Sequence, residues 1–198
     1  MGAVLAFDAV LSDFDGVLRH FDHAAQAAIE ARYGLPLMKT AFDPELIMPP
    51  TLGQATEAQW AESIALALGG DERVRQAVAE FMEIRFWVDE EVRALLAAAQ
   101  RHVPVILVTN AMDTLEAHLD LLGLTYFADD VVSSHRVGVA KPDPAIYRIA
   151  AERAGVAPER CLFVDDRPAN VEAARALGMT GVHYRTFDDL ASVLRLPS

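Results

Sequence analysis

Residues 9–18 read AVLSDFDGVL, and this stretch decides the fold. Its apolar run, Ala9–Leu11, leads into Asp13, Asp15 and Gly16. A short apolar run that is bounded by turn residues is typical of a buried strand ending in a tight turn. The stretch therefore predicts a strand with two carboxylates at its carboxyl end.

The second half of the chain alternates between apolar runs and helical segments. We predict strands at 103–108, 131–132, 161–164 and 181–184, and helices at 114–122, 145–154 and 171–177. A glycine follows each of these helices closely, which is an ordinary way for a helix to end. Apolar strands that alternate with helices indicate an α/β fold, in which a doubly wound parallel sheet carries helices on both faces.

Residues 22 to about 100 lie between the first two strands, and their pattern differs. Helical segments alternate with Pro- and Gly-rich breaks, without a convincing strand: helices at 24–33, 57–68 and 71–87, breaks at 34–36, 44–53 and 69–70. We therefore expect an α/β core formed by 1–21 and 91–198, and an inserted helical cap formed by 22–90. Such an insert would lie over one edge of the sheet as a lid.

Polar side chains follow the predicted strands where each strand ends. They are Asp13 and Asp15 after the first strand, Thr109 and Asn110 after the second, Lys141 in the loop after the third, and Asp165 and Asp166 after the fourth. In parallel α/β sheets, ligands bind beyond the carboxyl ends of the strands. We therefore expect these side chains to converge on one edge of the sheet.

This set of side chains suits phosphate-ester chemistry. A carboxylate with an ordinary pKa near ~4 is ionised at neutral pH and can attack phosphorus. Mg²⁺ prefers oxygen ligands, needs only one or two carboxylates, and relieves the repulsion between two anions. We expect Asp13 to be the nucleophile and Asp15 to act first as general acid and then as general base. Lys141, one of two lysines in the chain, would balance the charge.

Taken together, these motifs resemble those of the haloacid dehalogenase-like superfamily over nearly the whole chain. The four matching stretches are DFDGVL at 13–18, VTN at 108–110, KPD at 141–143 and FVDDRPAN at 163–170. The resemblance implies a Rossmann-like core with a small α-helical cap, Mg²⁺ as the cofactor and an aspartyl-phosphate intermediate. It also implies that the Thr109 hydroxyl and the neighbouring amide of Asn110 bind the transferring phosphoryl group.

The fourth motif departs from the Gly-Asp-x-x-x-Asp pattern that is frequent in the family. Asp165 stands in the place of the glycine, Asp166 in that of the first aspartate and Asn170 in that of the last. By this alignment Asp166 joins Asp13 and Asp15 as a metal ligand. Asp165 would act through a metal-bound water, and Asn170, which brings no charge, would orient Asp166 or a water.

Residues after the first motif and in the cap are candidates for substrate contact. Gly16, Arg19 and His20 belong to the first group, and residues 51–56 resemble the substrate-facing loop of the cap. We expect the other histidines of interest, His118 and His135, to be surface or loop residues.

Other activities of the superfamily stay open at this stage. A dehalogenase needs no metal and lacks the second aspartate of the first motif, yet Asp15 is present. Phosphonate cleavage needs a cap lysine, for which Lys39 is the only candidate, and usually lacks the same aspartate. A phosphomutase keeps all four motifs, whereas a non-catalytic binding module would have lost a carboxylate, and none is lost. A phosphatase is the principal hypothesis.

Composition limits the partners. Apolar residues make up 53% of the 198 residues, and the formal net charge is −12, so most of the surface would repel nucleic acid. No basic leader precedes an apolar stretch, and no apolar run approaches the ~18 residues that span a bilayer. We expect a cytoplasmic monomer or homodimer that binds a small phosphorylated substrate and no membrane. The single cysteine, Cys161, is expected to be a buried small hydrophobe.

Overall fold

The structure is a computed structural model that describes residues 6–194. The expectation about an N-terminal leader falls partly on residues 1–5, which lie outside the described residues, as do residues 195–198. In chain order the elements are β1 (Ala9–Ser12), β2 (Arg19–Phe21), α1 (His23–Tyr33), α2 (Leu37–Ala41), α3 (Pro44–Thr51), α4 (Glu57–Ala67), α5 (Glu72–Met82), β3 (Phe86–Val88), α6 (Glu90–Gln100), β4 (Val105–Thr109), α7 (Leu115–Leu121), β5 (Asp130–Ser133), α8 (Ser134–Val137), α9 (Pro144–Ala154), the 3-10 turn η1 (Pro158–Arg160), β6 (Cys161–Asp165), α10 (Pro168–Ala176), β7 (Thr180–His183) and α11 (Phe187–Ala191).

Five parallel strands form the central sheet, in the order β5-β4-β1-β6-β7. β1 lies in the middle, where Val10 is aligned with Val105 of β4 and with Leu162 of β6. Every residue of β1, β4 and β6 is buried, as is typical of strands covered on both faces. The doubly wound α/β fold expected from the sequence is confirmed.

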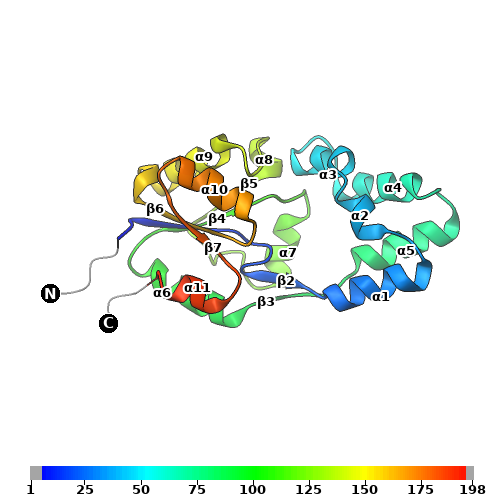
Figure 1. Cartoon of the computed structure of the whole chain (residues 1–198), viewed down its shortest axis with the longest axis horizontal. Coiled ribbons are helices and arrows are strands. Elements are labelled where there is room, and N and C mark those ends of the chain that lie inside the picture. The colour runs from blue at the N-terminus through cyan, green and yellow to red at the C-terminus, as the bar shows by residue number, and fades with distance from the viewer. Residues whose placement is uncertain (1–5, 195–198) are drawn as a thin grey trace.

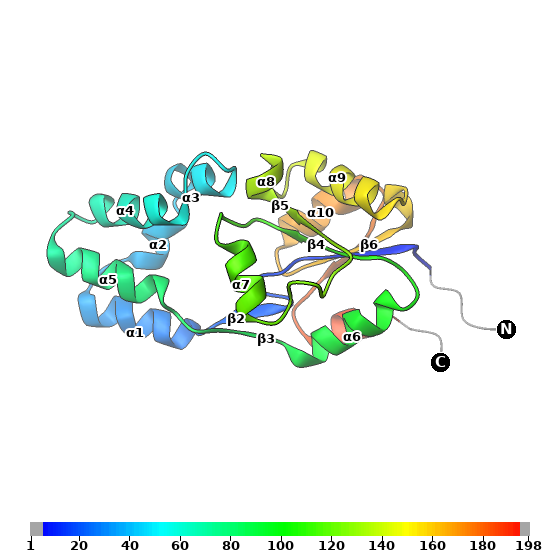
Figure 2. The same cartoon turned by 180° about the vertical axis from the view of Figure 1, so that it is seen from behind.

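Helices cover both faces of this sheet (Figure 1, Figure 2). On one face, α9 and α10 pack against strand residues that include Leu11 and Phe163. On the other face, α6, α7 and α11 pack against residues that include Val10 and Leu107. Because successive side chains of a strand point to opposite faces, both faces of the strands are taken up by apolar packing. Polar side chains are consequently concentrated where the strands end.

Helices α1 to α5 form a separate group beside the carboxyl ends of the strands (Figure 1). They have their own hydrophobic core, in which Leu37, Trp60, Ile64 and Phe81 are buried. The Trp60 indole Nε1 donates to the carbonyl of Ala41 at 3.0 Å, which joins α4 to α2. Two packed cores therefore exist, one around the sheet and one within the helices.

The chain passes between these two groups through a two-stranded antiparallel ribbon. β2 pairs with β3, so that Arg19 is aligned with Val88 and Phe21 with Phe86. The expectation that 22–90 contains no strand is wrong at Phe86–Val88, and the helix expected at 71–87 ends at Met82. The Phe-Trp-Val run was assigned to the preceding helix because it continues its apolar pattern, but aromatic and β-branched residues also favour strands.

The segment 44–53 was expected to be a Pro- and Gly-rich break, and this is also wrong. Residues Pro44–Thr51 form α3, whose Asp43 cap accepts a hydrogen bond from the backbone amide of Glu45. Pro44 occupies the first turn, where a missing N–H costs nothing, but Pro49 and Pro50 lie inside the helix. The helix forms although prolines remove two backbone donors. A high proline content therefore does not exclude a helix in this segment.

Within the described part of the chain, no helix is both long and apolar enough to cross a bilayer.

Candidate active site

The site is built around a buried lysine that contacts two carboxylates. The Nζ of Lys141 lies 2.7 Å from Oδ1 of Asp13 and 2.7 Å from Oδ2 of Asp165. Asp13 follows β1 and Asp165 ends β6, the neighbouring strand, so the parallel sheet itself places the two carboxylates side by side. All three side chains are almost entirely buried. The predicted convergence of these residues is observed.

Burial and charge act in opposite directions on the acidities of these groups. Burial raises the pKa of Asp13 well above its usual value, and the Lys141 ammonium opposes this while the charge of Asp165 adds to it. Burial also works to lower the pKa of Lys141, but attraction to Asp13 and Asp165 outweighs it and raises that pKa. Lys141 therefore stays protonated, and its charge partly offsets the effect of burial on Asp13.

A third carboxylate, that of Asp166, completes an acidic cluster. Oxygen atoms of Asp13, Asp165 and Asp166 all lie within 4.8 Å of one another. Burial, and then the charge of Asp165, raise the pKa of Asp166. Three carboxylates with one ammonium leave an excess of negative charge, and carboxylate oxygens are the donors that a hard divalent cation prefers. The donor set therefore fits Mg²⁺.

Gly16 allows Asp166 to reach this position. A Cβ atom at Gly16 would lie 2.5 Å from Oδ2 of Asp166, and the φ angle of Gly16 is +85°. A side chain at this position would meet both a close contact and an unfavourable backbone conformation. Gly16, which the sequence placed in a substrate-contacting group, thus lies against a cluster carboxylate in the structure.

Asn170 holds Asp165. Its Nδ2 lies 3.0 Å from both carboxylate oxygens of Asp165, and the backbone amide of Arg167 donates to Oδ1 of Asp165 at 2.8 Å. Asn170 was expected to orient Asp166 or a water, whereas its observed partner is Asp165. With Lys141 on Oδ2 as well, the Asp165 carboxylate is held by three donors.

Thr109 ends β4, the strand on the other side of β1 from β6, and Asn110 follows it. In the described structure the buried hydroxyl oxygen of Thr109 has no hydrogen-bond partner, which is costly unless a ligand supplies one. The Asn110 side chain is bonded to the backbone of Lys141 in both directions, at 2.9 Å and 2.8 Å. Asn110 thereby fixes the loop that carries Lys141, and its side chain is not the group offered to a ligand.

Asp15 has a different partner from the other acidic residues. Arg19 binds it with two hydrogen bonds, from Nε to Oδ1 at 2.5 Å and from Nη2 to Oδ2 at 2.9 Å. Its side chain is about one-third exposed, whereas that of Arg19 is 7% exposed. The sequence grouped Asp15 with the metal ligands, but the compact cluster of carboxylates contains Asp165 in its place.

Two residues assigned to substrate contact lie on the ribbon. Arg19 has its guanidinium engaged with Asp15 and with Nδ1 of His118, at 2.9 Å from Nη1. His20 lies 3.8 Å from the carboxylate of Asp89 and has its ring near that of Trp87. His118 was expected at the surface, but it is half-buried against Phe86. No local signal could have revealed this, because the contact depends on the ribbon reaching α7.

The helical insert touches the core at the start of α8. Ser134 Oγ donates to the carbonyl of Thr51 at 2.7 Å, and Nδ1 of His135 lies 3.0 Å from the carbonyl of Pro50. A Cβ atom at Gly53 would overlap the carbonyl oxygen of His135. Residues 50–53, part of which was expected to face the substrate, therefore form one contact between the insert and the core. The backbone amide of Glu57, which donates to Oδ1 of Asp113 at 2.7 Å, forms another. The local sequence predicts neither contact.

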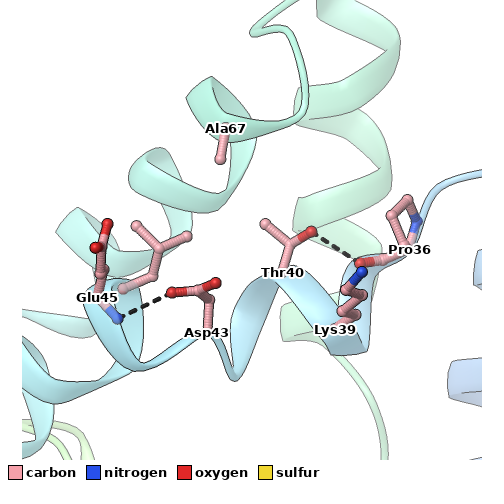
Figure 3. Close-up of a pocket in the computed structure, with 7 residues that line it drawn as sticks. Pro36, Lys39, Thr40, Asp43, Glu45 and Ala67 are labelled. Carbon is pink, nitrogen blue, oxygen red and sulfur yellow. Dashed lines mark hydrogen bonds between the residues drawn. The ribbon is translucent and has the colours of Figure 1, made fainter.

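A separate cavity of about 320 Å³ lies within the helical insert (Figure 3). Two of its polar lining residues are engaged locally, since Asp43 caps α3 and the Thr40 hydroxyl donates to the carbonyl of Pro36. The cavity is formed by α2, α3 and α4 and does not include the acidic cluster.

Comparisons with known proteins identify the family of the chain. The family model of haloacid dehalogenase-like hydrolases matches residues 7–178. A phosphoserine phosphatase from Thermus thermophilus is 32% identical over 81% of this chain, which spans 64% of that protein's length. A phosphatase from Mycobacterium tuberculosis is 30% identical over 88% of this chain and 86% of its own length.

The fold comparison agrees with the sequence comparison. A HAD family enzyme from Bacteroides thetaiotaomicron, solved in complex with magnesium and inorganic phosphate, superposes with a TM-score of 0.78 at 20% identity, over 96% of this chain and 100% of that one. At this level of identity the likeness concerns the fold. Together with the family match over residues 7–178, it means that the chain belongs to the haloacid dehalogenase-like hydrolases.

Proposed function

We propose that the chain is a Mg²⁺-dependent phosphatase that hydrolyses a small phosphorylated metabolite through an aspartyl-phosphate on Asp13. The observation that carries this proposal is the buried contact of Lys141 with Asp13 and Asp165, with Asp166 beside them. One ammonium fixes the attacking carboxylate, and the remaining negative charge is suited to a divalent cation. The unpartnered hydroxyl of Thr109 adds a donor for a phosphoryl oxygen.

The relatives support the same activity. Two curated relatives, matched over more than four-fifths of this chain, are phosphatases, and the structural neighbour was solved with magnesium and phosphate. The carboxylates of Asp13 and Asp166, with Asp165 directly or through a water, would hold the cation. When bound, Mg²⁺ would neutralise charge on the phosphoryl group as the nucleophile approaches. The first motif also suggested Asp15 as a ligand, but both of its carboxylate oxygens accept hydrogen bonds from Arg19, so we propose for it the acid–base role alone.

In the first step, a carboxylate oxygen of Asp13 attacks phosphorus and the bond to the leaving-group oxygen breaks. Lys141 holds Asp13 through Oδ1, and the backbone amide of Phe14 donates to the same oxygen at 2.6 Å. Both contacts leave Oδ2 of Asp13 as the oxygen that attacks. Asp15 acts as the general acid in its protonated form, and it transfers that proton to the leaving oxygen.

In the second step, water attacks phosphorus of the aspartyl-phosphate. Asp15, now a carboxylate, takes a proton from that water, and the bond between phosphorus and the Asp13 oxygen breaks. Inorganic phosphate leaves, and both aspartates return to their starting states. Thr109 and the backbone amide of Asn110 bind the phosphoryl oxygens during both steps.

We further propose that the helical insert acts as a cap over this site. It was expected at 22–90, and its helices extend from His23 to Met82, with the ribbon as the connection to the core. A cap excludes water while the carboxylate attacks and opens for phosphate release. The contact of Thr51 with Ser134 supports this role, because it joins the insert to the same side of the sheet as Lys141.

The test is to trap the phosphoenzyme. The protein is mixed with ³²P-labelled substrate found by screening phosphorylated metabolites with Mg²⁺, then quenched in acid and digested. We expect label on the peptide that contains Asp13, and none on Asp13→Asn, whose turnover should fall by several orders of magnitude. Label on the Asp13→Asn protein, or turnover close to that of the unmodified protein, would contradict the nucleophile assignment.

A further inference from the structure

Arg19 is enclosed by residues from three parts of the chain. Its guanidinium carbon lies 4.5 Å from the centre of the Phe14 ring, 4.8 Å from that of Phe21 and 5.3 Å from that of Phe86. Phe14 belongs to the first motif, while Phe21 and Phe86 come from the two strands of the ribbon. Cations are attracted to the faces of aromatic rings, and the attraction is stronger when water is excluded.

The hydrogen bonds of Arg19 point in two directions. Nε and Nη2 both donate to the carboxylate of Asp15, and Nη1 donates to Nδ1 of His118 on α7. Because the Arg19 nitrogen is the donor, Nδ1 of His118 is the acceptor and carries no proton in this arrangement. Burial, and then the charge of Arg19, lower the pKa of His118, which agrees with a neutral ring.

These contacts leave Arg19 poorly placed to bind a phosphoryl group. Its side chain is 7% exposed, three of its N–H donors are occupied, and its guanidinium faces aromatic rings. A bidentate pair fixes the plane of a carboxylate as well as its position. Asp15, which is one-third exposed, is therefore the partner that can still meet a ligand.

We propose that Arg19 is a positioning residue that holds the general acid and base Asp15 in place, and that His118 and the rings of Phe21 and Phe86 hold Arg19. This assignment rests on the proposed phosphatase function, and it replaces the expectation that Arg19 contacts the substrate. Among the described residues, the hydrogen bonds to the Asp15 carboxylate come from Arg19 alone, so the orientation of this carboxylate depends on Arg19. Arg19 lies four residues farther along the chain.

The experiment compares Arg19→Lys and Arg19→Gln with a matched control. Arg160 makes the same kind of bidentate pair, with Asp8, through Nε at 2.9 Å and Nη2 at 2.6 Å. Asp8 precedes β1, so this pair lies at the opposite end of the strand from Asp13. Arg160→Lys therefore changes a bidentate pair of the same geometry, although a more exposed one, without touching the site.

Steady-state kinetics on p-nitrophenyl phosphate distinguish positioning from substrate binding. We expect Arg19→Lys to lower kcat about tenfold and Arg19→Gln about 100-fold, because general acid–base catalysis contributes roughly 10²- to 10⁴-fold. KM and the inhibition constant of inorganic phosphate should stay within about twofold, and Arg160→Lys should match the unmodified protein. An unchanged kcat, or a loss confined to KM and phosphate inhibition, would overturn the proposal.

A second measurement needs no turnover and keeps the two proposals apart. The ¹³C resonance of the Asp15 carboxyl is assigned by its loss in Asp15→Asn, and the ¹⁵N resonances of His118 report its protonated nitrogen. We expect both signals to move in Arg19→Lys and Arg19→Gln, and neither in Arg160→Lys. If the resonances respond in this way but the protein hydrolyses no phosphate ester, the proposed function fails while the Arg19–Asp15 contact stands. If they do not move, the positioning role is wrong whatever the activity.

Discussion

A Cβ atom on Gly16 would lie 2.5 Å from Oδ2 of Asp166, closer than real Cβ contacts allow. The first motif and the fourth therefore meet at a position where a side chain would displace the Asp166 carboxylate. Gly16 contributes no functional group of its own, yet its lack of a side chain decides where a cluster carboxylate can lie.

Replacing Gly16 by alanine should accordingly weaken metal binding. We expect the affinity for Mg²⁺, measured by isothermal titration calorimetry, to fall roughly 10- to 100-fold, as for other changes that displace a ligand. Gly34→Ala is the control, since Gly34 has a φ of +64° but nothing within 4 Å of an added Cβ. Both variants should lose about 1–2 kcal/mol of stability, because an L-residue with a side chain is disfavoured at positive φ. Equal Mg²⁺ affinities in the two variants would show that the contact with Asp166 is unimportant.

Removing divalent cations should abolish turnover. When they are ionised, Asp13, Asp165 and Asp166 together bring three negative charges, and Lys141 balances one. Without a cation, the approach of a phosphate dianion is opposed by this excess charge. Hydrolysis of p-nitrophenyl phosphate should stop in EDTA and return on addition of Mg²⁺. Full activity in EDTA would instead favour chemistry at carbon, as in a dehalogenase.

Asp15→Asn should separate the two chemical steps. An amide cannot accept the proton of the attacking water, so breakdown of the aspartyl-phosphate should slow by roughly 10²- to 10⁴-fold. With p-nitrophenyl phosphate, whose leaving group needs little protonation, the phosphoenzyme should accumulate. Rapid-quench measurements would then detect a burst of nitrophenol close to one equivalent. A variant that is slow but shows no burst would mean that Asp15 acts mainly in the first step.

Gly53→Ala should loosen the contact between the insert and α8. The added Cβ would overlap the carbonyl oxygen of His135, so residues 50–53 would have to move away. We expect faster amide hydrogen exchange at Leu52 and Gln54, with exchange in β1 and β4 unchanged. Gly138→Ala is the control, because Gly138 has a φ of +70° and nothing within 4 Å of its Cβ. The same exchange rates in both variants would argue against a contact that holds the insert.

His118 should make stability depend on pH below about 6.5. Burial, and then Arg19, lower the pKa of His118 in the folded state, while the unfolded chain keeps a value near 6.5. Between these two values the unfolded chain binds a proton that the native state does not, so stability falls as pH falls. The free energy of unfolding in urea should therefore decrease from pH 7.5 to pH 5.5 by more in the unmodified protein than in His118→Gln. Equal decreases would mean that His118 does not contribute.

The sequence was sufficient for the sheet and for most of the site. Apolar strands and glycine-terminated helices predict a parallel sheet, and a parallel sheet brings the ends of β1, β4 and β6 together. Asp13, Thr109 and Asp165 therefore meet whatever the details of packing. Lys141 could be placed beside them because its loop follows β5 on the same edge.

The residues that the sequence missed depend on contacts between distant segments. In the sequence, Arg19 is a charged residue just after the first motif, with nothing to indicate burial. Its burial depends on the pairing of β2 with the three-residue strand β3. His118 lies on α7 and Ser134 on α8. The local sequence of these helices gives no sign that these residues form hydrogen bonds with Arg19 and Thr51. Short strands and prolines within a helix also carry weak local signals, which explains the errors at Phe86–Val88 and Pro44–Thr51.

The ribbon has a consequence for how this architecture can be shortened. The backbone amide of Asp22 donates to the carbonyl of Arg85 at 3.0 Å, so the chain leaves and re-enters at adjacent points. β2 and β3 thus correspond to the two strands of a β-hairpin, with helices α1 to α5 in the place of the turn. A two-residue Asn-Gly turn commonly connects the strands of a hairpin. Joining Asp22 to Arg85 through an Asn-Gly turn should give a shorter protein that keeps the sheet, the acidic cluster and the contact of Arg19 with Asp15. Its site would then be permanently open to solvent.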